Sequence, residues 1–104
     1  MSHVIIVLFN LKTEASVSAY EDWAKTTDLP IVRKLQSIDS FDLYKSLSVL
    51  GSDDTPPYEY VEVLTINDME VFEKDTSTDT MKAVAGEFQA FADNPTFILT
   101  QNIG

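Results

Sequence analysis

The chain has 104 residues, enough for one domain with a single hydrophobic core, and 44% of them are hydrophobic, as is typical of a folded globular protein. Its 17 acidic and 7 basic side chains give a net charge of −10, which argues against binding to nucleic acid or an anionic membrane surface. The chain has no cysteine, which excludes disulfides and thiolate metal ligands, and the apolar run from Val4 to Phe9 is too short to span a bilayer. We therefore expect one cytoplasmic domain over residues 1–104.

The first third of the chain predicts a strand and then a helix that breaks. Residues 3–12 are apolar and β-branched nearly throughout, as in a central strand that is buried on both faces. Ser18 and Glu21 then have the spacing of a capping box at the start of a helix. Because a proline restricts the residue before it, Pro30 predicts that this helix breaks at Asp28 and restarts beyond the proline.

The middle of the chain predicts two strands and a short helix. Apolar and polar side chains alternate over residues 41–48, which indicates a strand. A polar, proline-containing loop over residues 51–57 separates it from a third strand over residues 58–66, whose two faces are both largely apolar. Asn67 and Glu70 again have capping spacing and predict the start of a short helix.

A longer helix and a last strand complete the pattern. The segment Asp93–Pro95 predicts the end of this helix, and residues 96–103 form the last predicted strand. The apolar stripe of the helix consists of Met81, Val84, Ala85, Phe88 and Phe91.

The order strand, helix, strand, strand, helix, strand is that of the ferredoxin-like α+β fold, βαββαβ. Two crossover helices cover only one face of the sheet, so the other face would expose a large apolar patch in a monomer. Pairing two sheets by two-fold symmetry would cover this patch. We therefore predict a homodimer that forms a dimeric α+β barrel.

The sequence contains no motif for a metal or a cofactor. His3 is the only histidine, and Asp53 and Asp54 lack the ligand spacing of a calcium loop. With three glycines, the chain also has no glycine-rich loop that could hold a nucleotide or a flavin. We predict no metal site and no cofactor.

Aromatic side chains fall on the first helix, the last helix and the strands of this arrangement. They could line a cavity between the sheet and the helices and bind a flat ligand, although a plain aromatic core is the simpler interpretation. The set consists of Phe9, Tyr20, Trp23, Tyr44, Tyr60, Phe88 and Phe91. The candidate substrate-binding residues are all of these except Phe91.

Two carboxylates are the main candidates for chemistry. Glu62 lies on an otherwise apolar strand face, and Asp28 lies at the predicted helix break near Arg33. If both face the cavity, burial could raise the pKa of one while Arg33 keeps the other ionised, which would give an acid and a base. Asp28, Glu62 and Arg33 are thus the candidate catalytic residues. The alternative is that Asp28 only caps the helix at Pro30 and pairs with Arg33.

Residues 20–35, together with residues 40–44 and 58–63, resemble the RedY-like proteins of prodigiosin-type pigment pathways. The resemblance covers nearly the whole chain, and its most specific part is the pattern of Trp23, Asp28, Pro30 and Arg33. It implies a dimeric α+β barrel and a pathway that makes a red tripyrrole from pyrrole precursors. It also implies an aromatic bipyrrole aldehyde, or a related intermediate, as the ligand.

Three functions remain open at this point. The first is a small cofactor-free pathway protein that binds a planar intermediate against Trp23 and Tyr60, while Asp28 and Glu62 exchange protons during condensation, dehydration or isomerisation. The second is a non-catalytic carrier or a helper of other pathway enzymes, for which the aromatic pocket alone would suffice. The third is oxygenation, because cofactor-independent monooxygenases of the same superfamily use asparagine and tryptophan, which Asn10 and Trp23 could imitate.

Overall fold

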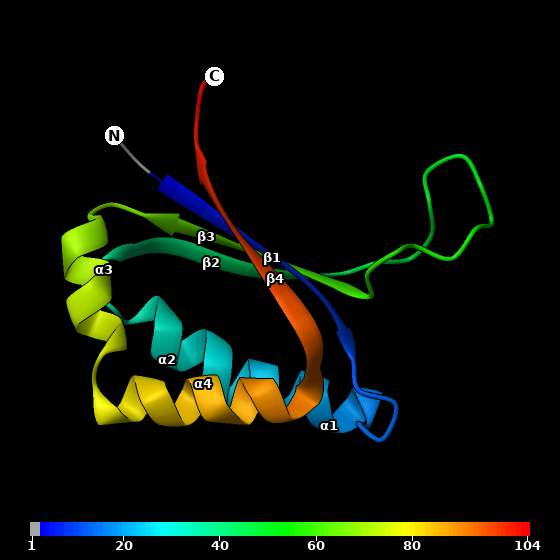
Figure 1. Ribbon diagram of the computed structural model, residues 1–104, viewed down its shortest axis with the longest axis horizontal. Helices are drawn as coiled ribbons and strands as arrows, with labels where there is room; N and C mark the ends of the chain where they lie inside the picture. The colour runs from blue at the N-terminus through cyan, green and yellow to red at the C-terminus, as the bar shows by residue number, and fades with distance from the viewer. Residues whose placement is uncertain (1–2) are drawn as a thin grey trace.

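Four strands form one antiparallel sheet, and the helices cover one of its faces (Figure 1). The structure is a computed structural model that describes residues 3–104. The sheet order is β2-β3-β1-β4, which confirms the predicted ferredoxin-like arrangement. In chain order the elements are β1 (His3–Leu11), α1 (Val17–Trp23), the π-helical turn η1 (Ala24–Asp28), α2 (Leu29–Arg33), β2 (Ile38–Lys45), β3 (Tyr60–Ile66), α3 (Met69–Thr76), α4 (Asp79–Phe91) and β4 (Ala92–Gln101).

Alternation along the strands decides which side chains face the helices. In β3 every second residue from Tyr60 to Ile66 is buried, and the residues between them are half-buried. In β1, Val7 lies opposite Glu62 of β3 and opposite Phe97 of β4. Since directly paired residues point to the same face of a sheet, Glu62 stands in the middle of the helix-covered face.

The core between the sheet and the helices is largely aromatic. Phe9 is fully buried and stacks on Tyr60, with 5.5 Å between the ring centroids. It also makes edge-to-face contacts with Tyr20 at 5.7 Å and with Phe88 at 5.0 Å. These rings hold α1 and α4 against β1 and β3.

The predicted restart after Asp28 is confirmed, since α2 begins at Leu29, but the backbone stays helical from Val17 to Arg33 and does not break at Asp28. Instead of breaking, the helix widens: the N–H of Leu29 donates to the carbonyl of Ala24, five residues earlier. A wider turn directly before Pro30 gives room to a ring that would clash with the carbonyl of an ordinary α-helical turn. Among residues 3–104 no helix is long and apolar enough to cross a bilayer.

Two predicted helix caps are displaced by one or two residues. The N-cap of α1 is Ser16, whose hydroxyl accepts a backbone N–H at 3.3 Å, and not Ser18. The N-cap of α3 is Asp68, and the amide of Asn67 donates instead to the carbonyl of Gln36. The spacing of polar residues predicts that a cap is present, but it does not decide between neighbouring candidates.

The strand boundaries also differ from the predicted ones. β2 ends at Lys45 and β3 begins at Tyr60, so residues 46–59 form a longer arm that projects from the sheet (Figure 1, green). β4 begins directly after α4, so Asp93–Pro95 belongs to the strand. Asn94 takes a left-handed φ of 50°, and the pairing of β4 with β1 shifts by one residue nearby, so the strand begins with a local irregularity at the segment where the helix was predicted to end.

Candidate functional site

Asp28 of η1 and Glu62 of β3 bring two carboxyl groups into the space between the sheet and the helices. Their residues are 6% and 5% exposed, which is rare for acidic side chains. No basic side chain pairs with either of them within residues 3–104, where the ion pairs join Arg33 to Asp42 and Lys45 to Glu21. The same residues contain no group of three or more His, Asp or Glu side chains that could hold a metal ion.

Burial raises the pKa of both carboxyl groups. The pKa of Asp28 rises to about 6, and that of Glu62 rises to about 8 because the charge of Asp28 adds to the effect of burial. Two carboxyl groups can form a hydrogen bond only when one of them carries a proton. The side chains of Asp28 and Glu62 lie within hydrogen-bonding reach of each other and can share such a proton, whereas Oε2 of Glu62 has no hydrogen-bond partner among the described residues. At neutral pH Glu62 is therefore the protonated member of the pair and Asp28 the ionised one.

The π-helical turn is what directs Asp28 inward. Tyr20, Ala24, Asp28 and Val32 are all buried and follow one another at intervals of four residues. In a regular α-helix each such interval overshoots a full turn by about 40°, so the last of the four would point well away from the first. A turn whose hydrogen bond spans five residues rotates the chain less per residue and so cancels much of this accumulated rotation. All four side chains therefore face the sheet.

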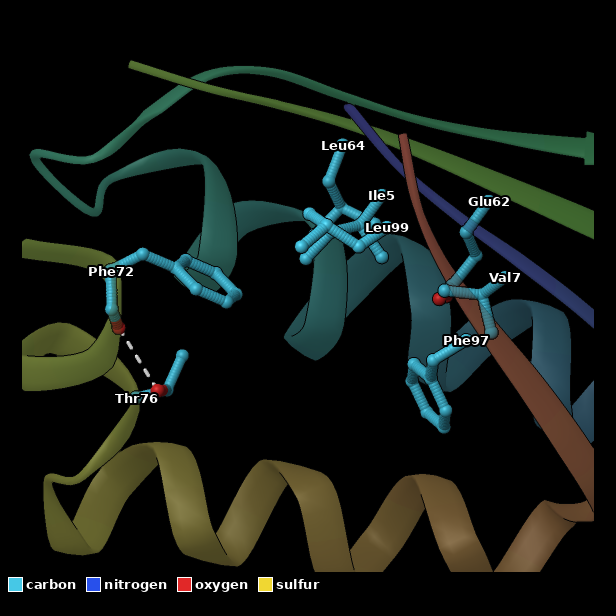
Figure 2. A pocket seen from close by; sticks show the side chains of 8 residues that line it. All are labelled: Ile5, Val7, Glu62, Leu64, Phe72, Thr76, Phe97 and Leu99. Carbon is cyan, nitrogen blue, oxygen red and sulfur yellow. Dashed lines mark hydrogen bonds between the residues drawn. The ribbon is translucent and has the colours of Figure 1, made fainter. Parts of the chain in front are cut away.

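A cleft of about 350 Å³ opens beside Glu62, between the sheet and α3. In Figure 2 the ring of Phe72 extends from α3 and the ring of Phe97 hangs from β4, with the carboxyl of Glu62 above it. The lining is apolar except for Glu62 and Thr76, whose hydroxyl donates to the carbonyl of Phe72 at 2.9 Å. The residues that define this cleft are Ile5, Val7, Glu62, Leu64, Phe72, Thr76, Phe97 and Leu99.

A smaller cavity of about 140 Å³, called the recess here, extends from the cleft to Asp28. The two share Glu62 and Phe97, and the recess adds Asp28 and the α4 residues Phe88 and Gln89. Phe97 points to the helix side of the sheet but is 58% exposed, because β4 is an edge strand that the helices cover only in part. A ligand that enters past Phe97 would therefore reach Glu62 first and Asp28 beyond it.

The predicted substrate-binding aromatics do not gather around this cleft. Phe88 alone lines the recess, whereas Phe9 and Tyr20 belong to the aromatic core. Tyr60 is also buried in the core, where its hydroxyl donates to Oε2 of Glu21 at 2.7 Å. For Phe9, Tyr20 and Tyr60 the interpretation as a plain core agrees with the structure.

Trp23 and Tyr44 lie outside the cleft and the recess. The indole N–H of Trp23 donates to Oε2 of Glu87 at 2.7 Å in an exposed position. Tyr44 pairs with Val61 on the outer face of the sheet and is 55% exposed. The sequence reasoning missed Phe72 and Phe97, because only the register of β4 and the place of α3 bring them to the cleft.

Arg33 does not contact Asp28, so both predicted roles of this arginine are wrong. Its Nε donates to the carbonyl of Phe41 at 2.9 Å, and its Nη2 lies 3.7 Å from Oδ1 of Asp42. Five residues along a helix correspond to a rotation of roughly 140°, which turns Arg33 away from the buried side. The side chain of Asp28 makes no capping bond to the backbone around Pro30 either.

The side chain of Asn10 is occupied by the arm that projects from the sheet. Its Nδ2 donates to the carbonyl of Pro57 at 3.2 Å, and its Oδ1 accepts the N–H of Glu59 at 3.0 Å. With the indole of Trp23 bonded to Glu87, the two side chains proposed for oxygenation are held by separate partners.

Comparisons with known proteins agree with the fold and with the resemblance found in the sequence. A family model described as REDY-like protein HapK matches residues 3–103. The chain belongs to this family. The crystal structure of HapK from Hahella chejuensis is 26% identical to this chain, with a TM-score of 0.80, and the match covers 98% of this chain and 93% of that one.

Two further solved structures share the fold at lower identity. A dimeric ferredoxin-like protein of unknown function from Thermobifida fusca is 11% identical with a TM-score of 0.76, covering 98% of this chain and 92% of its own. A variant of SnoaB, a cofactor-independent oxygenase from Streptomyces nogalater, is 13% identical with a TM-score of 0.75, covering 99% of this chain and 94% of its own. At these identities the likeness shows the fold alone. A comparison with curated proteins gives no match.

Proposed function

We propose that this protein is a cofactor-free cytoplasmic member of a prodigiosin-type pigment pathway, which binds a planar pyrrole-containing intermediate in the cleft and moves protons through Asp28 and Glu62. The observation that supports this proposal is the pair of buried carboxyl groups at the inner end of an apolar cleft. A volume of about 350 Å³ suits a small flat ligand. The resemblance to RedY-like proteins supports the pathway and a bipyrrole aldehyde as the ligand.

The pair can run an acid–base reaction without a cofactor. In a dehydration, Glu62 would donate its proton to a leaving hydroxyl group, which departs as water. Asp28 would take a proton from the ligand in the same step, so the total charge of the pair does not change. The rings of Phe72 and Phe97 would hold the flat ligand and keep water away from the carboxyl groups.

A non-catalytic carrier is the second candidate function, because an apolar lining alone would hold the ring and pass it to other pathway enzymes. Oxygenation has less support, because Asn10 and Trp23 are bonded to separate partners away from the carboxyl pair.

The first test replaces Asp28 by asparagine and measures ligand binding and turnover separately. Binding of a bipyrrole aldehyde is followed through the fluorescence of Trp23, which stacks at 6.5 Å on Phe88 of the recess. We expect Asp28→Asn to keep the Kd within about threefold and to lower turnover by a factor of about 100 or more, as for the loss of a general base. The matched control is Asp22→Asn, an exposed position on α1.

Each result separates the candidates. Undiminished turnover in Asp28→Asn would exclude Asp28 as the base. Saturable binding without turnover in the unmodified protein would support the carrier. The absence of saturable binding would contradict a pyrrole ligand in this cleft.

We also infer that two copies of the chain pair through the outer face of the sheet. That face carries Ile6, Val63 and Ile98 side by side on three neighbouring strands, and no helix of residues 3–104 covers it (Figure 1). Covering such an apolar face is the usual role of a symmetric partner.

A further inference from the structure

Within residues 3–104, no positively charged side chain lines the cleft or the recess. The only ionisable side chains that this part of the chain contributes to their lining are the carboxyl groups of Asp28 and Glu62. Thr76 already donates its hydroxyl to the backbone, and Gln89 is exposed. A bound ligand thus meets hydrogen-bond acceptors and one shared proton, but no lysine, arginine or histidine.

A lining that offers carboxyl groups but no cation discriminates between ligands by their charge. An anionic ligand would bring a second negative charge next to Asp28 in an apolar environment without a compensating cation, which is unfavourable. A cationic ligand with N–H groups could take the place of the shared proton and donate to both carboxylates at once. Such charge-assisted hydrogen bonds are stronger than those between neutral groups.

Resting on the proposed function, we infer that the cleft selects flat aromatic ligands that carry a delocalised N–H cation and rejects those that carry a carboxylate. The ring would lie in the apolar cleft, and its N–H groups would point to Glu62 and Asp28. Condensation of a pyrrole aldehyde with a second pyrrole, with uptake of one proton and loss of water, yields such a conjugated N–H cation. The proton of Glu62 would supply that uptake and leave a carboxylate facing the new cation.

Only the carboxyl pair can release a proton into this exchange near neutral pH. Among residues 3–104, the other titratable groups that face the pair from the elements packed against it are the hydroxyls of Tyr20 on α1 and Tyr60 on β3, and burial raises the pKa of both above their ordinary value. The elements β1, β2, β4, α2, α3 and α4 contribute only uncharged side chains to the lining. Uptake of the cation should therefore release a proton from the Asp28–Glu62 pair.

The test compares three probes that share one ring system and differ in charge: 2-naphthamidine, 2-naphthamide and 2-naphthoate. Each is titrated into the full chain by calorimetry at pH 7 and fixed ionic strength, in two buffers of different ionisation enthalpy. We expect the amidine to bind at least ~10-fold more tightly than the naphthoate, with the amide between them. We also expect about one proton to be released for each amidine bound, and none for the amide.

Two isosteric variants separate the site from the general negative charge of the protein. Glu62→Gln should reduce the preference for the amidine to less than about threefold and abolish proton release. Glu73→Gln removes a negative charge at an exposed position on α3, a larger change in net charge than Glu62→Gln makes at pH 7, and should still leave all three affinities unchanged. Both variants replace a carboxylate by an amide of the same size, so neither opens a cavity.

Equal binding of the amidine and the naphthoate would overturn this inference and leave the proposed function standing. The inference would also fail if Glu73→Gln weakened the preference for the amidine as much as Glu62→Gln does. If none of the three probes binds, the cleft is not a site for flat aromatic ligands, and the inference and the proposed function both fail.

Discussion

The carboxyl of Glu62 binds a proton more readily in the folded chain than in the unfolded one. Its pKa rises from an ordinary value of 4.5 to about 8 on folding, and that of Asp28 rises from 3.8 to about 6. Because the folded state holds more protons than the unfolded state between these values, the stability that protonation contributes is full at low pH and is lost as the pH rises. Hydrogen bonds from Tyr60 and Lys45 lower the pKa of Glu21 in the folded chain. This shift makes the stability increase with pH, but only at pH values below the ordinary pKa of a glutamate.

We therefore predict that the free energy of unfolding decreases between pH 5 and pH 8, by an amount on the order of 2–4 kcal/mol. Glu62→Gln should flatten this slope and be more stable than the unmodified chain at pH 8, because its amide donates to Asp28 without a proton from solution. Urea unfolding at pH 5, 6.5 and 8 measures the effect, with the exposed Glu73→Gln as the control. Parallel pH profiles for Glu62→Gln and the unmodified chain would contradict the prediction.

The two residues of the pair differ in how far the sequence revealed them. Glu62 could be found from alternation alone, because it is the one charged residue on the buried face of β3. The sequence indicated Asp28 for the wrong reason, since the expected partner Arg33 turns to Phe41 and Asp42. The contact between the two carboxyls joins residues far apart in sequence, and no local pattern encodes it.

At the scale of elements, the π-helical turn η1 connects the helix to the site. Deleting Thr26, which is exposed, should convert this turn into an ordinary α-helical one. Seven residues would then separate Tyr20 from Asp28, a rotation of about 700° that is only about 20° short of two full turns, so both would still face the sheet. The ring of Pro30 would instead meet the carbonyl group four residues earlier, so we expect a loss of about 2 kcal/mol or more in stability, whereas the pH dependence that the Asp28–Glu62 pair confers should be kept.

Unfolding experiments on the deletion variant at pH 5 and pH 8 test this prediction. The control is deletion of Asp53, which lies in the exposed arm and should change stability by less than about 0.5 kcal/mol. A Thr26 deletion that keeps its full stability would show that the wider turn is not needed to accommodate Pro30, and one that loses its pH slope would show that Asp28 no longer reaches Glu62.

The helices and strands themselves were more predictable than the turns and boundaries between them. Apolar periodicity located all four strands and the long helix α4, because burial of one face imposes that period on any sequence. The break expected at Pro30 did not occur, because a wider turn accommodates the proline ring without ending the helix. A turn of this kind has no periodicity of its own in the sequence.

At the scale of the whole molecule, the helices cover one face of the sheet and leave the other face uncovered within residues 3–104 (Figure 1). On this outer face Ile6 lies directly opposite Val63 on one side and Ile98 on the other, and Ile98 is 41% exposed. The uncovered face of the predicted sheet and the family resemblance both led us to expect a dimer, and the apolar side chains on the outer face support it. The proposed dimer face and the cleft lie on opposite sides of the same sheet, because the cleft lies on the helix-covered side.

We predict that the chain sediments as a dimer and that Ile98→Lys raises its dissociation constant at least ~10-fold, because a charge would be buried without a partner in the paired state. Ala90→Lys, at an exposed position of α4 on the helical side, should leave the dimer intact. Sedimentation of the unmodified chain as a monomer at high micromolar concentration would contradict this pairing, as would an undisturbed dimer of Ile98→Lys. Because the outer face and the cleft lie on opposite sides of the sheet, monomeric Ile98→Lys should keep the pH-dependent stability that Glu62 confers, and its loss would mean that the two faces are coupled.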